Sequence, residues 1–257
     1  MTAHSKTVLF ITGAWMHTSS WDKFRGAFEA AGYKTYAPAW PYLDGKPAEL
    51  RANPDKRLGK LTFKAIVDHY QAIIEKLDEK PIIIGHSMGG LITQLLLDRG
   101  LGVAGIAMDP GPTAGAFPGL ISLLAALPPI LGGPNTPYLI SRDGFAKNFA
   151  NTLTPAEQKL AYDDYVVPTS GRIFYQAAGM IGTGVNARAR KQPLLVISAE
   201  HDRTVSPFLA RQVYKLQKKA PVRTDFHEFK DRSHFLAGEK GWEEVAQYTL
   251  DWLAEAA

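Results

Sequence analysis

One serine lies in a sequence pattern that suits a nucleophile. The stretch Gly85-His-Ser87-Met-Gly89 follows an apolar run, Pro81–Ile84, and precedes a helical pattern that begins at Met88. A strand, a tight turn and a helix in this order lift a serine hydroxyl above the end of a sheet, and the turn requires small residues on both sides of the serine. The pattern therefore predicts that Ser87 is a nucleophile rather than a chance serine in a glycine-bearing turn.

A serine hydroxyl is a weak nucleophile and needs a base within hydrogen-bond reach. Two histidines stand in the last third of the chain, near the apolar run Thr224–Phe229. His227 falls inside this run, where a strand would fix its side chain in the sheet. His234 falls in the loop just after it, at the end where open parallel sheets carry their sites. We therefore expect His234 to be the base.

The base in turn needs a carboxylate that fixes its tautomer. Asp202 immediately follows another apolar run and stands between the serine and the histidine in chain order, as expected for a serine site on a parallel sheet. Glu200 lies nearer the end of the same run, and Asp109 follows a different run. Either could also reach the site, although a turn role is the simpler expectation for Asp109. We expect Asp202 to be the acid.

Attack on a carbonyl creates a negatively charged oxygen, which two backbone N–H groups can stabilise. Met88 follows the nucleophile at the start of a helix and is expected to supply one of them. The loop after the first apolar run is expected to supply the other from Ala14, because Gly13 lets the backbone turn toward the serine. Trp15 and His17 on this loop are candidate substrate contacts. The alternatives are ordinary packing for Trp15 and a solvated position for His17.

Apolar runs of strand length alternate with helical patterns along the chain. This alternation predicts an α/β fold with a mostly parallel sheet and helices on both faces. Several runs are apolar throughout, which is typical of strands buried on both faces. The expected strands are 8–11, 34–37, 81–84, 103–108, 193–197 and 224–229, and the expected helices are 21–31, 62–77, 88–99, 207–219 and 242–253.

The stretch between Met108 and Pro193 interrupts this alternation. It contains an apolar segment, Pro118–Leu131, and a helix start at Thr154-Pro-Ala-Glu157 that has the capping-box pattern. We expect this stretch to be a helical cap inserted at the edge of the sheet. The sequence thus predicts one domain, with a core formed by residues 1–110 and 191–257 and a cap formed by residues 111–190.

Composition excludes several other classes of protein. The 257 residues include 29 Lys and Arg, interspersed with 25 Asp and Glu, so we expect no nucleic-acid partner. The chain contains no cysteine, which excludes a thiol nucleophile, disulfides and cysteine-ligated metals. No apolar segment reaches the roughly 20 residues of a membrane span, and the N-terminus lacks a signal-peptide pattern. We expect a cytoplasmic protein that needs no cofactor, no metal and no membrane.

These motifs together resemble the α/β-hydrolase superfamily over nearly the whole chain. Gly85–Gly90 matches its nucleophile elbow, and Thr12-Gly-Ala-Trp15 resembles the His-Gly-x loop that supplies the oxyanion hole. Asp202 and His234 match the acid and base loops. The start directly on the oxyanion strand is similar to the plant methylesterase and hydroxynitrile lyase branch and its bacterial relatives. Two departures are Thr12, which stands in the place of the usual histidine, and Ala37–Tyr42, where relatives often carry an aspartate and a glycine.

The resemblance implies a serine hydrolase that cleaves a carboxylic ester of a small, largely apolar substrate through an acyl-enzyme. The apolar segment 118–131 would either roof the acyl pocket or pack on the sheet edge as core. One alternative is a carbon–carbon hydrolase or lyase with the same three residues, for which Lys230 and Arg232 are the nearest candidate cations. The other is a receptor that binds a small molecule without turnover. Further pocket wall is expected from Phe117, Phe145, Phe149 and Tyr175.

Overall fold

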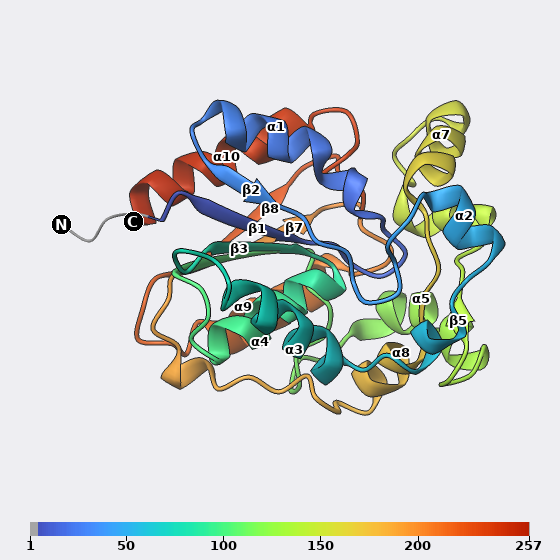
Figure 1. Cartoon of the computed structure of the whole chain (residues 1–257), viewed down its shortest axis with the longest axis horizontal. Coiled ribbons are helices and arrows are strands. Elements are labelled where there is room, and N and C mark those ends of the chain that lie inside the picture. The colour runs from blue at the N-terminus through green and yellow to red at the C-terminus, as the bar shows by residue number, and fades with distance from the viewer. Residues whose placement is uncertain (1–4, 257) are drawn as a thin grey trace.

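Six parallel strands form a single sheet at the centre of the molecule (Figure 1). The computed structural model of the chain describes residues 5–256. The strands lie in the order β2-β1-β3-β4-β7-β8, which confirms the predicted α/β fold. They are β1 (Thr7–Ile11), β2 (Lys34–Tyr36), β3 (Ile82–His86), β4 (Ala104–Met108), β7 (Leu194–Ala199) and β8 (Thr224–Phe229).

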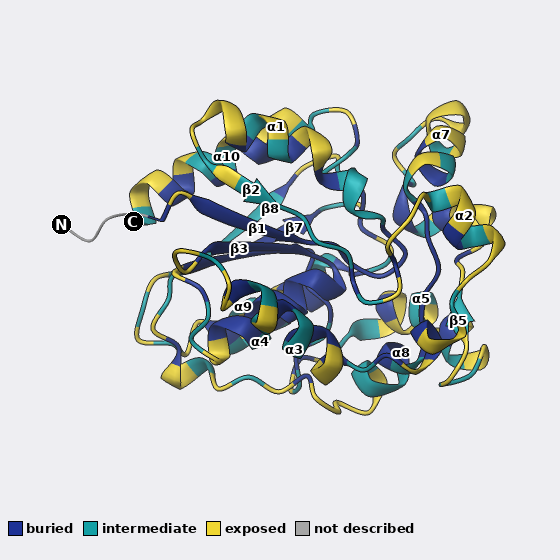
Figure 2. Ribbon diagram, in the orientation of Figure 1, coloured by how far each residue is buried: buried dark blue, intermediate teal, exposed yellow. Residues whose placement is uncertain are grey.

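Helices cover both faces of the sheet, and their buried sides face the strands (Figure 2). Two helices pack against each other on one face, and three lie on the opposite face (Figure 1). The first two are α1 (Asp22–Ala30) and α10 (Trp242–Ala256), and the other three are α3 (Phe63–Ile74), α4 (Met88–Asp98) and α9 (Pro207–Gln217). All five predicted helices are present, and most end a few residues earlier than the sequence pattern suggested.

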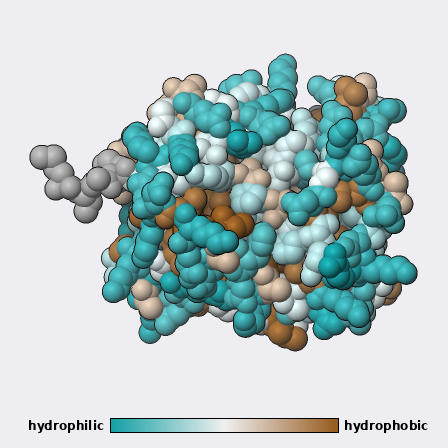
Figure 3. Space-filling model, in the orientation of Figure 1, coloured by the Kyte–Doolittle hydropathy of each residue, from teal (hydrophilic) through white to brown (hydrophobic). Residues whose placement is uncertain are grey.

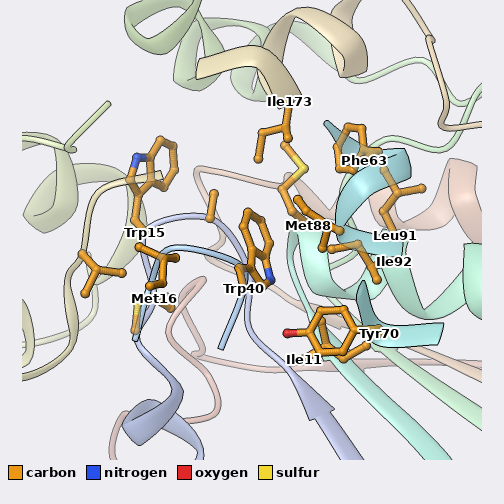
Figure 4. Close-up of a cluster of buried hydrophobic side chains, with 14 of the residues drawn as sticks. Ile11, Trp15, Met16, Trp40, Phe63, Tyr70, Met88, Leu91, Ile92 and Ile173 are labelled. Atoms are coloured by element: carbon orange, nitrogen blue, oxygen red, sulfur yellow. The ribbon is translucent and has the colours of Figure 1, made fainter. Parts of the chain in front are cut away.

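The two faces of the sheet belong to two separate hydrophobic clusters, and β1 contributes to both. Val8 and Phe10 pack in the cluster under α1 and α10. Leu9 and Ile11 point to the opposite face and pack in the cluster that holds Tyr70 of α3 (Figure 4). Alternate side chains of a strand point to opposite faces of its sheet. A strand with a cluster on each side must therefore be apolar at every position, as this run of the sequence is.

Local capping signals define where two helices begin. Ser206 accepts a hydrogen bond from the N–H of Leu209 and caps α9. Thr154 and Glu157 form the predicted capping box at the start of α7 (Pro155–Tyr165), with the Glu157 carboxylate 2.8 Å from the N–H of Thr154. Such bonds satisfy N–H groups that the helix itself leaves unpaired, which is why both starts could be predicted from sequence.

The chain between β4 and β7 contributes no strand to the central sheet. Most of its elements gather beyond one end of that sheet (Figure 1). Two short strands of this stretch pair antiparallel to each other. Its elements are α5 (Gly119–Leu131), β5 (Pro137–Tyr138), α6 (Arg142–Gly144), η3 (Phe145–Phe149), α7, β6 (Thr169–Ser170), α8 (Gly171–Ala178) and η4 (Ala187–Ala189).

Three short helical segments lie elsewhere, in the connections that follow β1 and β2. They are η1 (Thr18–Trp21), α2 (Pro47–Ala52) and η2 (Lys56–Lys60). The face shown in Figure 3 is mainly hydrophilic, with smaller hydrophobic areas between polar side chains. Across residues 5–256, no helix has the length and apolar character needed to cross a membrane.

The turn between β3 and α4 leaves no room for a side chain at Gly85. A Cβ there would overlap the carbonyl of Gly89 and the hydroxyl of Thr93. Gly26 of α1 offers a contrast, because a Cβ there would meet no heavy atom within 4 Å. The glycine in β3 is therefore required by its surroundings, whereas the glycine in α1 is not.

We expect Gly85→Ala to lower the free energy of unfolding by about 3 kcal/mol or more, at the upper end of overpacking costs. Gly26→Ala should raise it by roughly 0.5–1 kcal/mol, because alanine loses less backbone entropy on entering a helix. Urea denaturation of both variants measures these changes. A Gly85→Ala protein that unfolds at the wild-type urea concentration would contradict the tight turn.

Candidate active site

Ser87 stands between β3 and α4 with a strained backbone. Its φ is 57° and its ψ is −123°, a region that costs a non-glycine residue about 1–3 kcal/mol. Two hydrogen bonds to β4 and the loop after it hold this conformation. The N–H of Ser87 donates to Met108 O at 2.8 Å, and the carbonyl of Ser87 accepts from the N–H of Gly111 at 2.8 Å. The side chain is thereby fixed at the carboxyl end of the sheet.

The loop after β1 passes directly beside the Ser87 side chain. A Cβ on Gly13 would lie 2.5 Å from Ser87 Cβ and 3.2 Å from Ser87 Oγ, so only glycine fits there. The next residue, Ala14, borders the same cavity as Ser87 and Met88. Met88 is the first residue of α4, and the first N–H groups of a helix have no acceptor within it. The structure thus brings both expected oxyanion donors to one cavity with the serine.

His234 and Asp202 form a buried pair. The distance from His234 Nδ1 to Asp202 Oδ2 is 2.5 Å, and both side chains are completely buried. The other carboxylate oxygen, Oδ1, accepts hydrogen bonds from the N–H of Thr204 at 2.7 Å and of Val205 at 2.8 Å. These two bonds fix the orientation of the carboxylate, and the carboxylate fixes the imidazole.

The second ring nitrogen of His234 is available to act as a base. With Nδ1–H donating to Asp202, Nε2 carries a lone pair, and among residues 5–256 it has no hydrogen-bond partner. No hydrogen bond joins it to Ser87 Oγ in this ligand-free structure, although such bonds often tighten only when substrate binds. His234 does pack against His86, the residue before the serine, with ring centroids 4.5 Å apart.

Burial sets the electrostatics of this pair. Loss of hydration lowers the pKa of His234, which favours the neutral imidazole that a base requires. The ring of Phe149 packs edge-on against His234, with centroids 4.5 Å apart, and keeps water from that side. Desolvation also raises the pKa of Asp202, while the hydrogen bonds from Thr204 and Val205 oppose this change by favouring the carboxylate.

A cavity of about 270 Å³ opens in front of Ser87. Most of its wall is apolar and comes from the stretch between β4 and β7. Side chains of α5 form one side and side chains of α8 form another. Wall residues include Phe117, Ser122, Leu123, Ala126, Phe174 and Ala177.

The helix α5 presents apolar side chains in two directions. Leu123 and Ala126 line the cavity, whereas Leu120, Leu124 and Leu131 are well exposed. The sequence left open whether this segment roofs a pocket or packs wholly as core. The structure shows it lining the cavity with one side while much of the other side stays uncovered within residues 5–256.

Trp15 belongs to the cavity, whereas His17 does not. Trp15 has a φ of 67° and lines the cavity, where its ring stacks on Phe174 with centroids 5.1 Å apart (Figure 4 shows Trp15 with Met88). His17 instead begins η1, where its Nδ1 lies 2.8 Å from Ser19 Oγ and accepts from the N–H of Ser19. It is not among the residues that line this cavity.

The aromatic wall differs in part from the sequence expectation. Phe117 lines the cavity as expected. Phe145 and Phe149 do not, since both are fully buried and stacked on each other at 5.1 Å. Tyr175 also lies outside the wall and hydrogen-bonds to the carbonyl of Ile130. Phe174, one residue earlier, occupies the wall instead. The apolar pair at 173–174 on α8 was the only sequence signal for it.

The other candidate charges lie away from the cavity. Glu200 pairs with Lys230 at 2.9 Å, and Arg232 pairs with Glu244 at 2.8 Å. None of these four residues lines the cavity. His227 lies in β8, as expected, and stacks on Tyr248. Within residues 5–256, the cavity in front of Ser87 therefore has no cationic side chain in its wall.

Asp109 is the one alternative acid that lies close to the pair. It is completely buried, and its Oδ1 accepts a hydrogen bond from the N–H of Ala199 at 2.8 Å. The expectation of a simple turn residue is therefore incomplete, because an exposed turn aspartate would keep its carboxylate in water. Sequence alone gave no sign of this burial.

Comparisons with known proteins give the same picture of the fold. The chain is 23% identical to a monoacylglycerol lipase from Paleococcus ferrophilus, covering 98% of this chain and 95% of the lipase, with a TM-score of 0.69. It is 17% identical to a methylesterase from Arabidopsis, covering 96% and 98%, with a TM-score of 0.66.

A third solved structure is that of tomato methylketone synthase I complexed with 2-tridecanone, at 15% identity, covering 98% and 99%, with a TM-score of 0.70. Among curated proteins, none matches the sequence. At these identities the solved structures show a shared fold. The match of residues 8–248 to the Alpha/beta hydrolase family shows that the chain belongs to that family.

Proposed function

We propose that this chain is a carboxylic ester hydrolase that works through an acyl-enzyme on Ser87. The observation that carries the proposal is the buried His234–Asp202 pair, which has a free ring nitrogen. The His234 ring packs against His86, the residue before a strained serine. A serine needs such a base to attack a carbonyl. The family to which the chain belongs supports a hydrolase, and esterases and lipases are among its structural neighbours.

In the proposed reaction, Ser87 Oγ attacks the ester carbonyl carbon while His234 Nε2 takes the hydroxyl proton. Asp202 holds the imidazole and stabilises its protonated form. The N–H groups of Ala14 and Met88 stabilise the tetrahedral oxyanion. His234 then delivers the proton to the leaving alcohol. Water, activated by the same histidine, attacks the acyl-enzyme and releases the acid, so the chemistry needs no cofactor or metal.

The proposed substrate is a small, neutral ester with an apolar acyl group. The cavity wall around Ser87 is largely apolar, and burial of each methylene there would contribute about 0.8 kcal/mol. A neighbour of the same fold, methylketone synthase I, was solved with 2-tridecanone. This ligand, like the proposed ester, joins an apolar chain to a carbonyl group. We further propose that residues 111–190 act as a cap, because side chains from α5 and α8 form much of this wall.

The two alternatives have less support. A lyase or carbon–carbon hydrolase that needs a cation beside its substrate would have to find one elsewhere, because Lys230 and Arg232 are both paired with glutamates. A receptor without turnover would have no need of the oriented His234–Asp202 pair. Ester hydrolysis uses the strained serine, the buried His234–Asp202 pair and the apolar cavity together.

Replacing the nucleophile gives the first test of this function. We expect Ser87→Ala to fold normally and to lower kcat on p-nitrophenyl esters by roughly 10⁴-fold or more, because the three residues act as a unit. A fluorophosphonate probe should label the wild type and not the variant. Labelling that persists at another serine would show that Ser87 is not the nucleophile.

The acid can be separated from its neighbour on the same loop. We expect Asp202→Asn to reduce turnover by roughly 10³–10⁴-fold, because an amide favours the wrong imidazole tautomer. Glu200→Gln is the matched control, since Glu200 lies two residues away and pairs with Lys230 at the surface. It should keep nearly full kcat. Comparable losses of kcat in the two variants would mean that turnover depends on the conformation of the loop and not on the Asp202 carboxylate.

The size of the cavity predicts a dependence on acyl length. We expect kcat/KM to rise from acetate to butyrate or hexanoate, and neutral esters to be preferred over esters charged near the carbonyl. Ala126→Phe would fill the cavity from α5 and should move the optimum to shorter chains. Leu124→Phe, on the exposed side of the same helix, is the control and should leave the profile unchanged. A wild-type profile that falls steadily from acetate would contradict an apolar acyl site.

A further inference from the structure

A second buried carboxyl group lies beside the His234–Asp202 pair, and the proposed reaction does not use it. Asp109 directly follows β4, the strand that lies between β3 and β7 in the sheet. It therefore stands between the strand that carries Ser87 and the strand that precedes Asp202. Its N–H donates to Ile197 O at 2.8 Å, which ties its backbone to β7.

The two oxygens of the Asp109 carboxyl have different surroundings. Oδ1 accepts the N–H of Ala199 at 2.8 Å. Oδ2 is also buried, and within residues 5–256 it has no hydrogen-bond partner. A carboxyl oxygen of Asp109 and one ring nitrogen each of His86 and His234 lie within 4.8 Å of one another. The carboxyl thus belongs to the same small group as the base.

The groups that face Asp109 do not favour a negative charge on it. They are His86, Asp202, His234 and Glu239, and the two carboxylates among them repel a second charge. Desolvation and the charge of Asp202 raise the pKa of Asp109 well above its usual range. The Asp202 side chain further raises the pKa of Asp109, because the two buried carboxyl groups are close enough to interact. Two carboxyl groups that share a site in this way hold a proton between them.

We propose that Asp109 is a positioning residue that keeps its proton at neutral pH and donates it from Oδ2 in a hydrogen bond to Asp202. The Asp202 carboxylate would then accept four hydrogen bonds, from His234, Thr204, Val205 and Asp109. These bonds would fix its orientation. Because Asp109 is neutral, it adds no second negative charge beside His234. The proposal rests on the proposed function in one respect, namely that Asp202 and His234 serve as acid and base.

The alternative roles make different predictions. An ionised Asp109 would act as a second acid and would raise the pKa of His234. A purely structural Asp109 would only accept the N–H of Ala199 at the end of β7. An asparagine separates a neutral Asp109 from an ionised one, because its amide can donate to Asp202 and its oxygen can accept from Ala199 while it carries no charge. An alanine removes both hydrogen bonds.

The first measurement is ester hydrolysis by the two variants. We expect Asp109→Ala to lower kcat at least about tenfold with little change in KM, since a hydrogen bond to a charged group is commonly worth that factor. Asp109→Asn should recover most of this loss. An alanine variant as active as the wild type, or an asparagine variant as impaired as alanine, would overturn the proposal.

The pH profile of kcat/KM separates a neutral Asp109 from an ionised one. If Asp109 is neutral, Asp109→Asn leaves the acid-limb pKa within about 0.3 units of wild type, because no charge is lost. If Asp109 is ionised, the loss of its charge beside the imidazolium lowers that pKa by about one unit or more, and the proposal fails. Glu243→Gln, an exposed carboxyl group on α10, is the control and should not change the profile.

Thermal unfolding tests the proton on Asp109 without any activity. In the unfolded chain Asp109 loses its proton above its ordinary pKa of about 4, whereas the folded protein retains it. The folded state then binds more protons, so Asp109 makes the wild type lose stability as the pH rises above 4. Asparagine removes this loss.

We therefore expect the Tm of Asp109→Asn minus that of the wild type to increase between pH 4 and pH 8. A difference that stays flat or decreases would show an ionised Asp109 and overturn the proposal. An increase in a protein that hydrolyses no ester would instead leave the proton on Asp109 established and refute the proposed function. Failure of the Asp109 proposal can thus be distinguished from failure of the proposed ester hydrolysis.

Discussion

The site depends on a backbone conformation that Ser87 would not adopt by itself. Its positive φ is held by hydrogen bonds to Met108 and Gly111 and by close approaches at three glycines. Gly85 lets β3 and α4 approach each other, Gly89 lets α4 approach the end of β1, and Gly13 lets the loop after β1 reach the serine. Strain of this kind persists only where the surroundings over-determine it. The packed parallel sheet supplies those surroundings, because β3 lies between β1 and β4.

The same sheet explains why residues far apart in sequence meet. In a parallel sheet all carboxyl ends lie on one edge, and β3, β4, β7 and β8 are consecutive neighbours. The residues that follow these four strands, Ser87, Asp109, Asp202 and His234, are therefore brought to a single edge. All four side chains are buried, and Phe149 from the stretch between β4 and β7 packs against His234. Desolvation then favours a neutral His234 and a proton on one of the two aspartates, so the fold determines both the geometry of the site and its charge.

Much of this organisation could be predicted from the sequence, because the signals for it lie in short stretches of neighbouring residues. The inner strands of the sheet are mostly apolar runs. The starts of α7 and α9 carry their own capping residues, such as Thr154 and Ser206. The elbow is likewise a local pattern. The cavity wall was not predictable, because the choice between Phe174 and Tyr175 depends on how α8 packs against α5. The burial of Asp109 and the capping role of His17 also arise from tertiary contacts that no local pattern encodes.

The central claim is that Ser87, His234 and the two backbone donors form one acyl-transfer site. A crystal structure of the protein after reaction with a phosphonate ester tests it most directly, since the adduct imitates the tetrahedral intermediate. We predict phosphorus bonded to Ser87 Oγ, with a phosphoryl oxygen about 2.7–3.1 Å from the backbone nitrogens of Ala14 and Met88. The alkyl group should lie in the cavity under α5 and α8. An adduct on another serine, or a phosphoryl oxygen turned away from both nitrogens, would contradict the account.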